Sequence, residues 1–215
     1  MAAEIGTVTN RAYEPGDESA INDGFNRVFG LRRPVSEWHW KFPAAPYGRY
    51  ITITASESGA VLAHYGAIPV RFQLGGEVVQ AGQIVDVYSV PEVRGTRVFA
   101  NCWEQFVADY GNPTHLPLWF GYPGVRHYEM GIKRMSYIPL GSVPLWRRPA
   151  PERGAVPSLR FRLRSGFDAM AVEGLWRRAA GRYPVAAVRD GEWISRRFTG
   201  HPRLAYTHVS AWRRG

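Results

Sequence analysis

Apolar residues recur with a strand-like period in some stretches of the chain and with a helical period in others. Residues 7–13 alternate between polar and apolar positions and predict a short strand. A helix is expected over residues 17–29, because its apolar side chains fall three or four positions apart and Gly30 can end it. A second, short helix is expected around Trp38–Phe42. The chain therefore opens with the order strand, helix, helix.

Strand signals dominate the next part of the chain. Gly75-Gly76 separates two short alternating runs and predicts a two-residue hairpin turn. Gly82–Val90 is mostly apolar, as expected of a buried central strand. The other strands predicted here are Arg49–Ser56, Val61–Pro69, Val70–Leu74 and Glu77–Gln80.

Helical periodicity returns at Val98–Val107, after Pro91 and Gly95. Shorter elements follow. They are strands at Pro117–Tyr122, Arg134–Ile138, Val185–Val188 and Leu204–Ala211, and helices at Val125–Met130, Asp168–Ala180 and Asp190–Phe198. In the helix Asp168–Ala180 the candidate core residues are Met170, Leu175 and Trp176. This order of elements predicts an α+β fold whose mixed sheet has a strand–loop–helix unit at its centre.

Proline and glycine gather in residues 141–157, which predicts a linker or a long crossing loop. We therefore expect a compact domain over residues 1–140 and a separate C-terminal segment over residues 158–215. A length of 215 residues is enough for one well-packed domain and part of another.

Charge is distributed unevenly along the chain. Residues 1–146 carry 12 basic and 13 acidic side chains, whereas residues 147–215 carry 15 basic and 5 acidic ones. Such a basic segment can bind nucleic acid, but no nucleic-acid-binding motif accompanies it, and a basic surface also suits a polyanionic cofactor. The single cysteine, Cys102, excludes an internal disulfide, and the N-terminus shows no signal peptide. We expect a cytoplasmic protein without a membrane span.

The stretch Val85–Phe106 carries the most informative chemistry. An apolar strand runs into a loop with Arg94, Gly95 and Arg97, and a helix follows. The N-terminus of a helix offers free N–H groups, glycine lets the backbone approach a ligand, and arginine donates charge-assisted hydrogen bonds to phosphate. Together they predict a pyrophosphate site. The alternative is an ordinary strand-to-helix turn whose arginines lie in water.

This loop resembles the acetyl-CoA pyrophosphate loop of the GNAT N-acetyltransferases, with Pro91-x-x-Arg94-Gly95-x-Arg97-x-Phe99 before the helix. Further pieces resemble larger bacterial members of that superfamily, in the same order along residues 7–140. They are Arg11-Ala-Tyr, Phe25-Asn26-x-Val28-Phe29, Trp38-x-Trp40-Lys41, Ala63-His-Tyr-Gly-Ala-Ile-Pro69, Gly82-Gln-Ile-Val-Asp86, and Gly121-Tyr-Pro followed by Met130-Gly131.

The resemblance implies a GNAT-like fold, a mixed and mostly antiparallel sheet flanked by helices, with acetyl-CoA or another acyl-CoA as cofactor. Residues 158–215 resemble the start of a second, degenerate GNAT-like half. In the family loop small residues usually stand where this chain has Arg97 and Phe99. A side chain at Arg97 can crowd the pyrophosphate or grip it. The residues implied to bind the cofactor are Val87, Tyr88, Ser89, Val90, Arg94, Gly95, Thr96, Arg97, Val98 and Phe99.

The resemblance also implies direct attack of a primary amine on the acyl thioester. Asp86 and Glu92 are the nearest carboxylates that can act as the base, and burial would raise the pKa of Asp86. Their alternatives are a structural carboxylate and an acid that complements the helix dipole. His127 or Tyr128 would protonate the departing thiolate. The scattered histidines predict no metal site.

Two other functions remain open from the sequence. The changes at Arg97 and Phe99 are compatible with an inactive relative that serves as a binding or interaction module, and the basic C-terminal third with a nucleic-acid-associated protein. The acceptor is expected to be a small molecule or a peptide. The last strand is an edge on which a second copy of the chain can pair to form a homodimer.

Overall fold

The computed structural model describes residues 6–43, 47–145, 147 and 160–213. By its internal contacts the chain forms two compact units, Met1–Gly121 with Asp168–Tyr206, and Tyr122–Phe167 with Thr207–Gly215. Both units are discontinuous in sequence. The predicted division at 140 and 158 therefore stays a prediction, and most of its linker, residues 146 and 148–157, lies outside the described residues.

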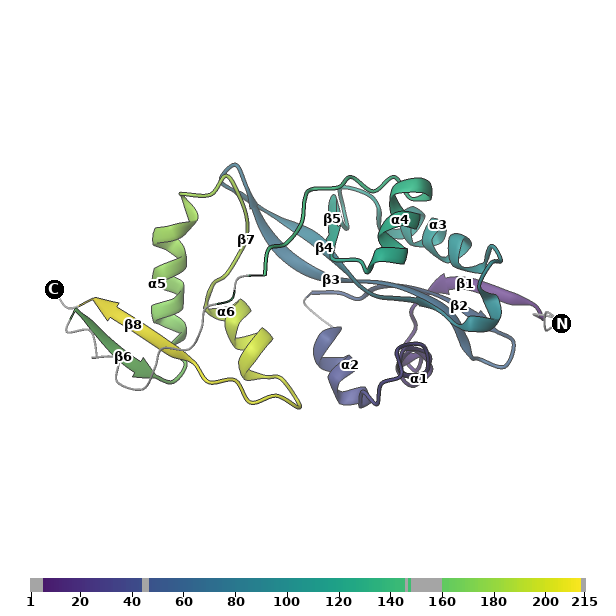
Figure 1. The fold of residues 1–215 in the computed structure, drawn as a ribbon, viewed down its shortest axis with the longest axis horizontal. Helices are drawn as coiled ribbons and strands as arrows, with labels where there is room; N and C mark the ends of the chain where they lie inside the picture. The colour runs from purple at the N-terminus through teal and green to yellow at the C-terminus, as the bar shows by residue number, and fades with distance from the viewer. Residues whose placement is uncertain (1–5, 44–46, 146, 148–159, 214–215) are drawn as a thin grey trace. The chain divides into compact units, whose positions relative to one another are not determined.

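The first unit is built on one sheet with the strand order β1-β2-β3-β4-β5, in which β7 pairs with β3 (Figure 1). The first four strands are antiparallel, and β4 pairs with β5 in parallel. The bounds are β1 Val8–Ala12, β2 Tyr50–Ser56, β3 Val61–Leu74, β4 Glu77–Ser89, β5 Leu118–Gly121 and β7 Val185–Ala187. This arrangement confirms the expected α+β fold with a mixed, mostly antiparallel sheet.

Helices cover both faces of this sheet. Figure 1 shows α1 (Glu18–Phe29) and α2 (Val35–Lys41) on one face and α3 (Val98–Tyr110) on the other. Two further helices, α5 (Ala169–Ala180) and α6 (Gly191–Ile194), belong to the same unit, and a π-helical turn at Ser195–Thr199 continues α6. None of the described helices is long and apolar enough to cross a membrane.

Each face of the sheet has its own buried core. Under α1 and α2 the core is a cluster around Trp38, Ile51 and Ile53, all fully buried. Under α3 the rings of Tyr65 and Phe106 lie 4.8 Å apart. Cores on both faces require the two-sided hydrophobic strands that the sequence shows between residues 50 and 90.

Several expected elements differ from the structure. The four runs predicted between residues 61 and 90 form only two long strands, β3 and β4, because each run continues its neighbour without a break in pairing. The strand predicted at Arg134–Ile138 is absent from the described residues. α4 (Val125–Arg134) takes its first residue, and the amides of Met135 and Tyr137 both donate to the carbonyl of Gly131. The strand predicted at Leu204–Ala211 lies later in the chain and is shorter, since β8 runs from Val209 to Arg213.

The C-terminal helix α5 also departs from its expected packing. Met170 and Leu175 were candidate core residues, but they are 75% and 60% exposed. In the second unit, β8 pairs with the strand β6 (Phe161–Ser165), which the pattern did not predict. The second GNAT-like half implied for residues 158–215 is not confirmed, because β7 joins the main sheet instead.

One contact between α1 and β4 yields a testable prediction. A Cβ atom at Gly24 would lie 2.5 Å from Oη of Tyr88, whereas one at Gly174 in α5 would meet only a flexible arginine tip at 3.4 Å. Gly24→Ala should therefore destabilise the protein by about 1–3 kcal/mol through overpacking. The control Gly174→Ala should stabilise it by about 0.5–1 kcal/mol through helix propensity. Urea unfolding measures both changes, and a harmless Gly24→Ala would contradict the packing described.

Candidate functional site

Strand β4 contains a bulge near its C-terminal end. His64 of β3 pairs with Tyr88, but Gly66, only two residues further on, pairs with Val85, so β4 carries one residue more than its partner. Asp86 lies in this bulge with a φ of 54°, in the left-handed region. That conformation costs a residue other than glycine on the order of 1–3 kcal/mol, so neighbouring groups must hold it in place.

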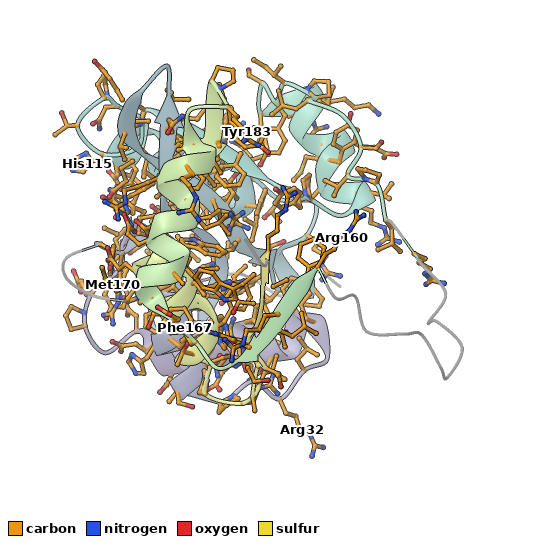
Figure 2. The ribbon with its side chains drawn as sticks, turned by 90° about the vertical axis from the view of Figure 1, so that its left-hand side faces the viewer. Arg32, His115, Arg160, Phe167, Met170 and Tyr183 are labelled. Carbon is orange, nitrogen blue, oxygen red and sulfur yellow. The ribbon has the colours of Figure 1, made fainter. Side chains whose placement is uncertain are left out.

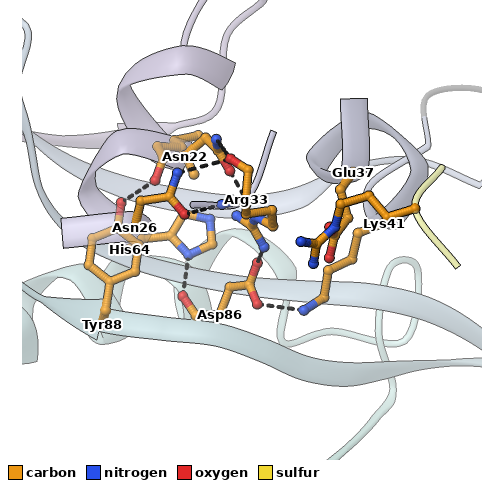
Figure 3. A network of polar contacts seen from close by, with 10 residues as sticks. Asn22, Asn26, Arg33, Glu37, Lys41, His64, Asp86 and Tyr88 are labelled. Carbon is orange, nitrogen blue, oxygen red and sulfur yellow. Dashed lines mark hydrogen bonds and ion pairs between the residues drawn. The ribbon is translucent and has the colours of Figure 1, made fainter. Parts of the chain in front are cut away.

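The side chain of Asp86 is held by two cations (Figure 3). Arg33 Nη1 and Lys41 Nζ each donate to one of its carboxylate oxygens at 2.5 Å. The side chains of Arg33 and Asp86 are only 4% exposed. Arg33 also donates through Nε to Asn22 Oδ1 at 2.7 Å and lies over the ring of Phe25 at 3.7 Å. The bulge is thus tied to α1, α2 and the loop between them.

These ion pairs decide the protonation state of Asp86. Burial alone would raise its pKa, but the neighbouring Lys41 and Arg33 outweigh burial and lower the pKa below its ordinary value. The expectation of a raised pKa at Asp86 is therefore wrong. The carboxylate is ionised, and each of its oxygens already accepts a hydrogen bond from a cation.

His64 holds the backbone of the bulge. Its Nδ1 lies 2.8 Å from the carbonyl oxygen of Asp86, so Nδ1 carries the hydrogen and donates it. The ring is fully buried, and burial lowers its pKa to about 4 even though the Asp86 carboxylate opposes that shift. The ring also stacks on that of Tyr88, with 5.4 Å between the ring centroids. The Tyr88 hydroxyl donates a hydrogen bond to the carbonyl of Ile21 in α1. The neutral His64 thus connects β3 to the bulge of β4, and Tyr88 connects β4 to α1.

Beyond the bulge, one edge of β4 is open. The parallel strand β5 pairs only with Ala81–Ile84 of β4. Among the residues that the structure describes, no strand pairs with Val85–Ser89 on that side. This edge includes three of the residues implied to bind the cofactor, namely Val87, Tyr88 and Ser89. Its backbone can therefore offer hydrogen bonds to an extended ligand.

The loop after β4 is exposed at its tip. A short 3₁₀ turn, Pro91–Val93, leads to Gly95, which has a φ of 85° and nothing within 4 Å of where a Cβ would lie. Glycine suits both the backbone conformation and a close approach to a ligand. Thr96 accepts a hydrogen bond from the amide of Val98 at 3.2 Å, and α3 begins there.

Neither of the unusual residues fills this loop. The Arg97 side chain is 74% exposed and turns along α3, where it donates to Glu104 at 2.9 Å. The ring of Phe99 lies 6.2 Å from that of Tyr65, within the packing between α3 and the sheet. The loop thus remains accessible to a phosphate group.

The other predicted acid–base residues take no part in the hydrogen bonds that hold Asp86. Glu92 forms an ion pair with Arg27 of α1, and a hydrogen bond from its own amide, together with Arg27, lowers its pKa. His127 and Tyr128 lie on α4 of the second unit. There His127 Nε2 lies 2.9 Å from the hydroxyl of Tyr137, and burial lowers the pKa of His127. Tyr128 is 42% exposed.

Sequence reasoning missed the groups that hold Asp86. Arg33, Lys41 and His64 were not singled out, although Lys41 and His64 lie within motifs that carry the family resemblance. A signal was present in Lys41, one of two lysines in a chain rich in arginine. Among the described residues, no three His, Cys, Asp or Glu side chains gather as they would around a metal ion.

Comparison with known proteins identifies one family whose model matches the chain. A family model described as an acetyltransferase (GNAT) domain matches residues 9–134, more than half of the chain. None of the curated proteins compared with the chain matches it.

Solved structures share this fold. A probable N-acyltransferase from Enterococcus faecalis V583 aligns with a TM-score of 0.68 and 10% identity, over 96% of this chain and 52% of that one. Saccharomyces cerevisiae N-myristoyltransferase with bound myristoyl-CoA aligns at 0.55 and 13%, over 92% and 51%. A predicted acetyltransferase with acetyl-CoA from Clostridium acetobutylicum aligns at 0.51 and 12%, over 65% and 96%. The chain spans about half the length of the first two proteins.

The low pKa of His64 makes the stability of the fold depend on pH. The unfolded chain protonates this ring below its ordinary pKa of 6.5, whereas the folded protein keeps it neutral down to about 4. The free energy of unfolding should therefore fall as the pH drops from 6.5 toward 4. Urea unfolding measures this dependence. Between pH 7 and pH 5 the free energy of unfolding of the unsubstituted protein should fall by about 2 kcal/mol more than that of His64→Gln. Equal losses would mean that His64 titrates normally.

Proposed function

This chain belongs to the GNAT acetyltransferase family, and on that premise we propose that it transfers an acyl group, most simply acetyl, from acyl-CoA to a primary amine by direct attack. The observation that carries the proposal is the exposed loop at Gly95, which lies between the open edge of β4 and the N-terminus of α3. The sequence of this loop, Pro91 to Phe99, also resembles the pyrophosphate loop of the family.

The residues present fit an acyl-CoA molecule. The exposed loop residues Arg94–Arg97 and the first amides of α3 would hold the diphosphate, because a helix N-terminus and guanidinium groups both attract anions. The open edge of β4 at Val87–Ser89, together with Val90 directly after the strand, would pair with the amide groups of the pantetheine arm. Val98 and Phe99, the first residues of α3, would anchor the end of the loop, because Val98 is buried and the ring of Phe99 lies next to that of Tyr65 in β3.

The bound cofactor supplies a thioester that is activated toward amines. Backbone N–H groups at the bulge of β4 would stabilise the oxyanion that forms when the amine attacks the carbonyl carbon. We assign Asp86 a positioning role, because its ion pairs lower its pKa and occupy both of its oxygens. Glu92 also has a lowered pKa, so water is the carrier we propose for the proton of the amine.

We propose Tyr128 as the group that protonates the thiolate when the carbon–sulfur bond breaks. His127 is the less suitable donor, because burial lowers its pKa and its Nε2 already contacts Tyr137. Tyr128→Phe should therefore lower kcat by about 100-fold and leave the KM for acetyl-CoA within about threefold. His127→Gln should lower kcat far less. A thiol-release assay measures both variants, and a reversed order of their effects would transfer the role to His127.

Binding of the cofactor can be tested without knowing the acceptor. Acetyl-CoA at 100 times its dissociation constant should stabilise the fold by about 2.7 kcal/mol, which a thermal-shift titration detects. Arg94→Ala should weaken binding by about tenfold through the loss of one charge-assisted contact. Arg178→Ala, an exposed arginine on α5, is the matched control and should change nothing.

The result separates three cases. An absent shift at millimolar acetyl-CoA would reject the proposed function. A shift without thiol release across a broad panel of amines would favour an inactive binding module instead. A shift with thiol release would support an active enzyme.

A further inference from the structure

A pocket of the first unit is lined in part by the residues that hold the bulge. It is a pocket of about 120 Å³ whose walls come from α1, α2, the loop between them and the chain near residue 203. Its lining residues are Phe25, Leu31, Arg32, Arg33, Glu37, Lys41 and Arg203. Four of the seven residues are cations, and only one is an anion.

Most of the charges in this pocket are already partly compensated. Arg33 and Lys41 share the carboxylate of Asp86, as Figure 3 shows. Arg203 forms an ion pair with Glu37. Four cations thus face two carboxylates, which leaves an excess of two positive charges. Arg32, which is exposed, supplies part of that excess (Figure 2).

One buried donor in the pocket wall has no acceptor. Arg33 is 5% exposed, and among the described residues its Nη2 atom finds no hydrogen-bond partner. A buried, charged donor that lacks a partner destabilises the fold, and it does so more strongly than a neutral donor in the same state. An anionic oxygen within the pocket would satisfy this guanidinium and would also neutralise the excess charge.

The pocket and the bulge share two residues. The Arg33 and Lys41 side chains line the pocket and also bind Asp86 in the bulge of β4. A ligand in the pocket would therefore lie next to the segment of β4 that is proposed to present the acyl group. Phe25 and Leu31 add apolar surface for a carbon skeleton.

We propose that this pocket selects an acceptor amine that carries an anionic group, a carboxylate or a phosphate. The cations of the pocket would bind the anionic group and leave the amine directed toward the acyl carbon. Polycationic acceptors such as polyamines and aminoglycosides are disfavoured, because the excess positive charge of the pocket repels them. This inference deepens the proposed function and rests on it.

Matched pairs of amines test the inference by calorimetry on the full chain saturated with CoA. One pair is phenylalanine and phenylalaninamide, which differ in the carboxylate. The other is glucosamine 6-phosphate and glucosamine, which differ in the phosphate. In at least one pair, the amine that carries the carboxylate or phosphate should bind about tenfold tighter than the amine that lacks it, as a charge-assisted contact predicts. The pair that shows the preference identifies the kind of anion.

A variant locates the preference. Arg32→Gln should reduce it by about fivefold or more, since this side chain lines the pocket and lies outside the network that holds Asp86. Arg182→Gln, an exposed arginine of the same unit, is the matched control and should leave the preference unchanged. Circular dichroism verifies that both variants fold.

Each outcome decides the inference. Equal affinity within both pairs, no binding of either member, or a preference that survives Arg32→Gln would overturn it. The proposed function is judged separately by thiol release from acetyl-CoA. Preferential binding of the amine with the anionic group, without acyl transfer, would reject the enzyme but keep the anion pocket. Transfer only to amines that lack an anionic group would reject only the pocket.

Discussion

The ion pairs of Asp86 with Arg33 and Lys41 are the interaction on which the rest of the structure depends. They hold Asp86 of β4 in a left-handed backbone conformation, which is unfavourable for a residue other than glycine unless its neighbours stabilise it. Breaking a buried pair costs about 3–5 kcal/mol, because one charge is left without compensation. The same contacts anchor α2 and the loop after α1 to the sheet. Loss of either cation would therefore disturb the fold and the candidate site together.

The topology of the sheet places the loop and the open edge next to this bulge. Because β5 pairs in parallel with only the first part of β4, the backbone after Ile84 is open on one side. The strand then ends at Ser89, and the exposed loop leads directly into α3. An extended ligand could follow β4 and reach the helix N-terminus with its diphosphate. The geometry thus combines a strand edge and a helix end, two backbone sites that need few special side chains.

The sequence predicted what depends on local periodicity. The strand–loop–helix unit and the α+β class are confirmed, because apolar spacing reports directly on burial within one element. The bulge at Asp86 could not be predicted, since one extra residue in a long apolar run leaves no mark on its pattern. The pKa of Asp86 was wrongly expected to rise, because Arg33 and Lys41 lie 53 and 45 residues away in the chain. Met170 and Leu175 show the converse, because their spacing predicts a buried helix face but both side chains are exposed.

We propose that β4, its bulge and the following loop together form one acyl-CoA site. A crystal structure of the full chain grown with acetyl-CoA tests this most directly. We expect the pantetheine arm along Val87–Val90, diphosphate oxygens on the amides between Gly95 and Val98, and the acetyl carbonyl beside the bulge, with Asp86 still bound to both cations. Cofactor bound elsewhere, or an Asp86 released from Arg33 and Lys41 in the complex, would contradict the account.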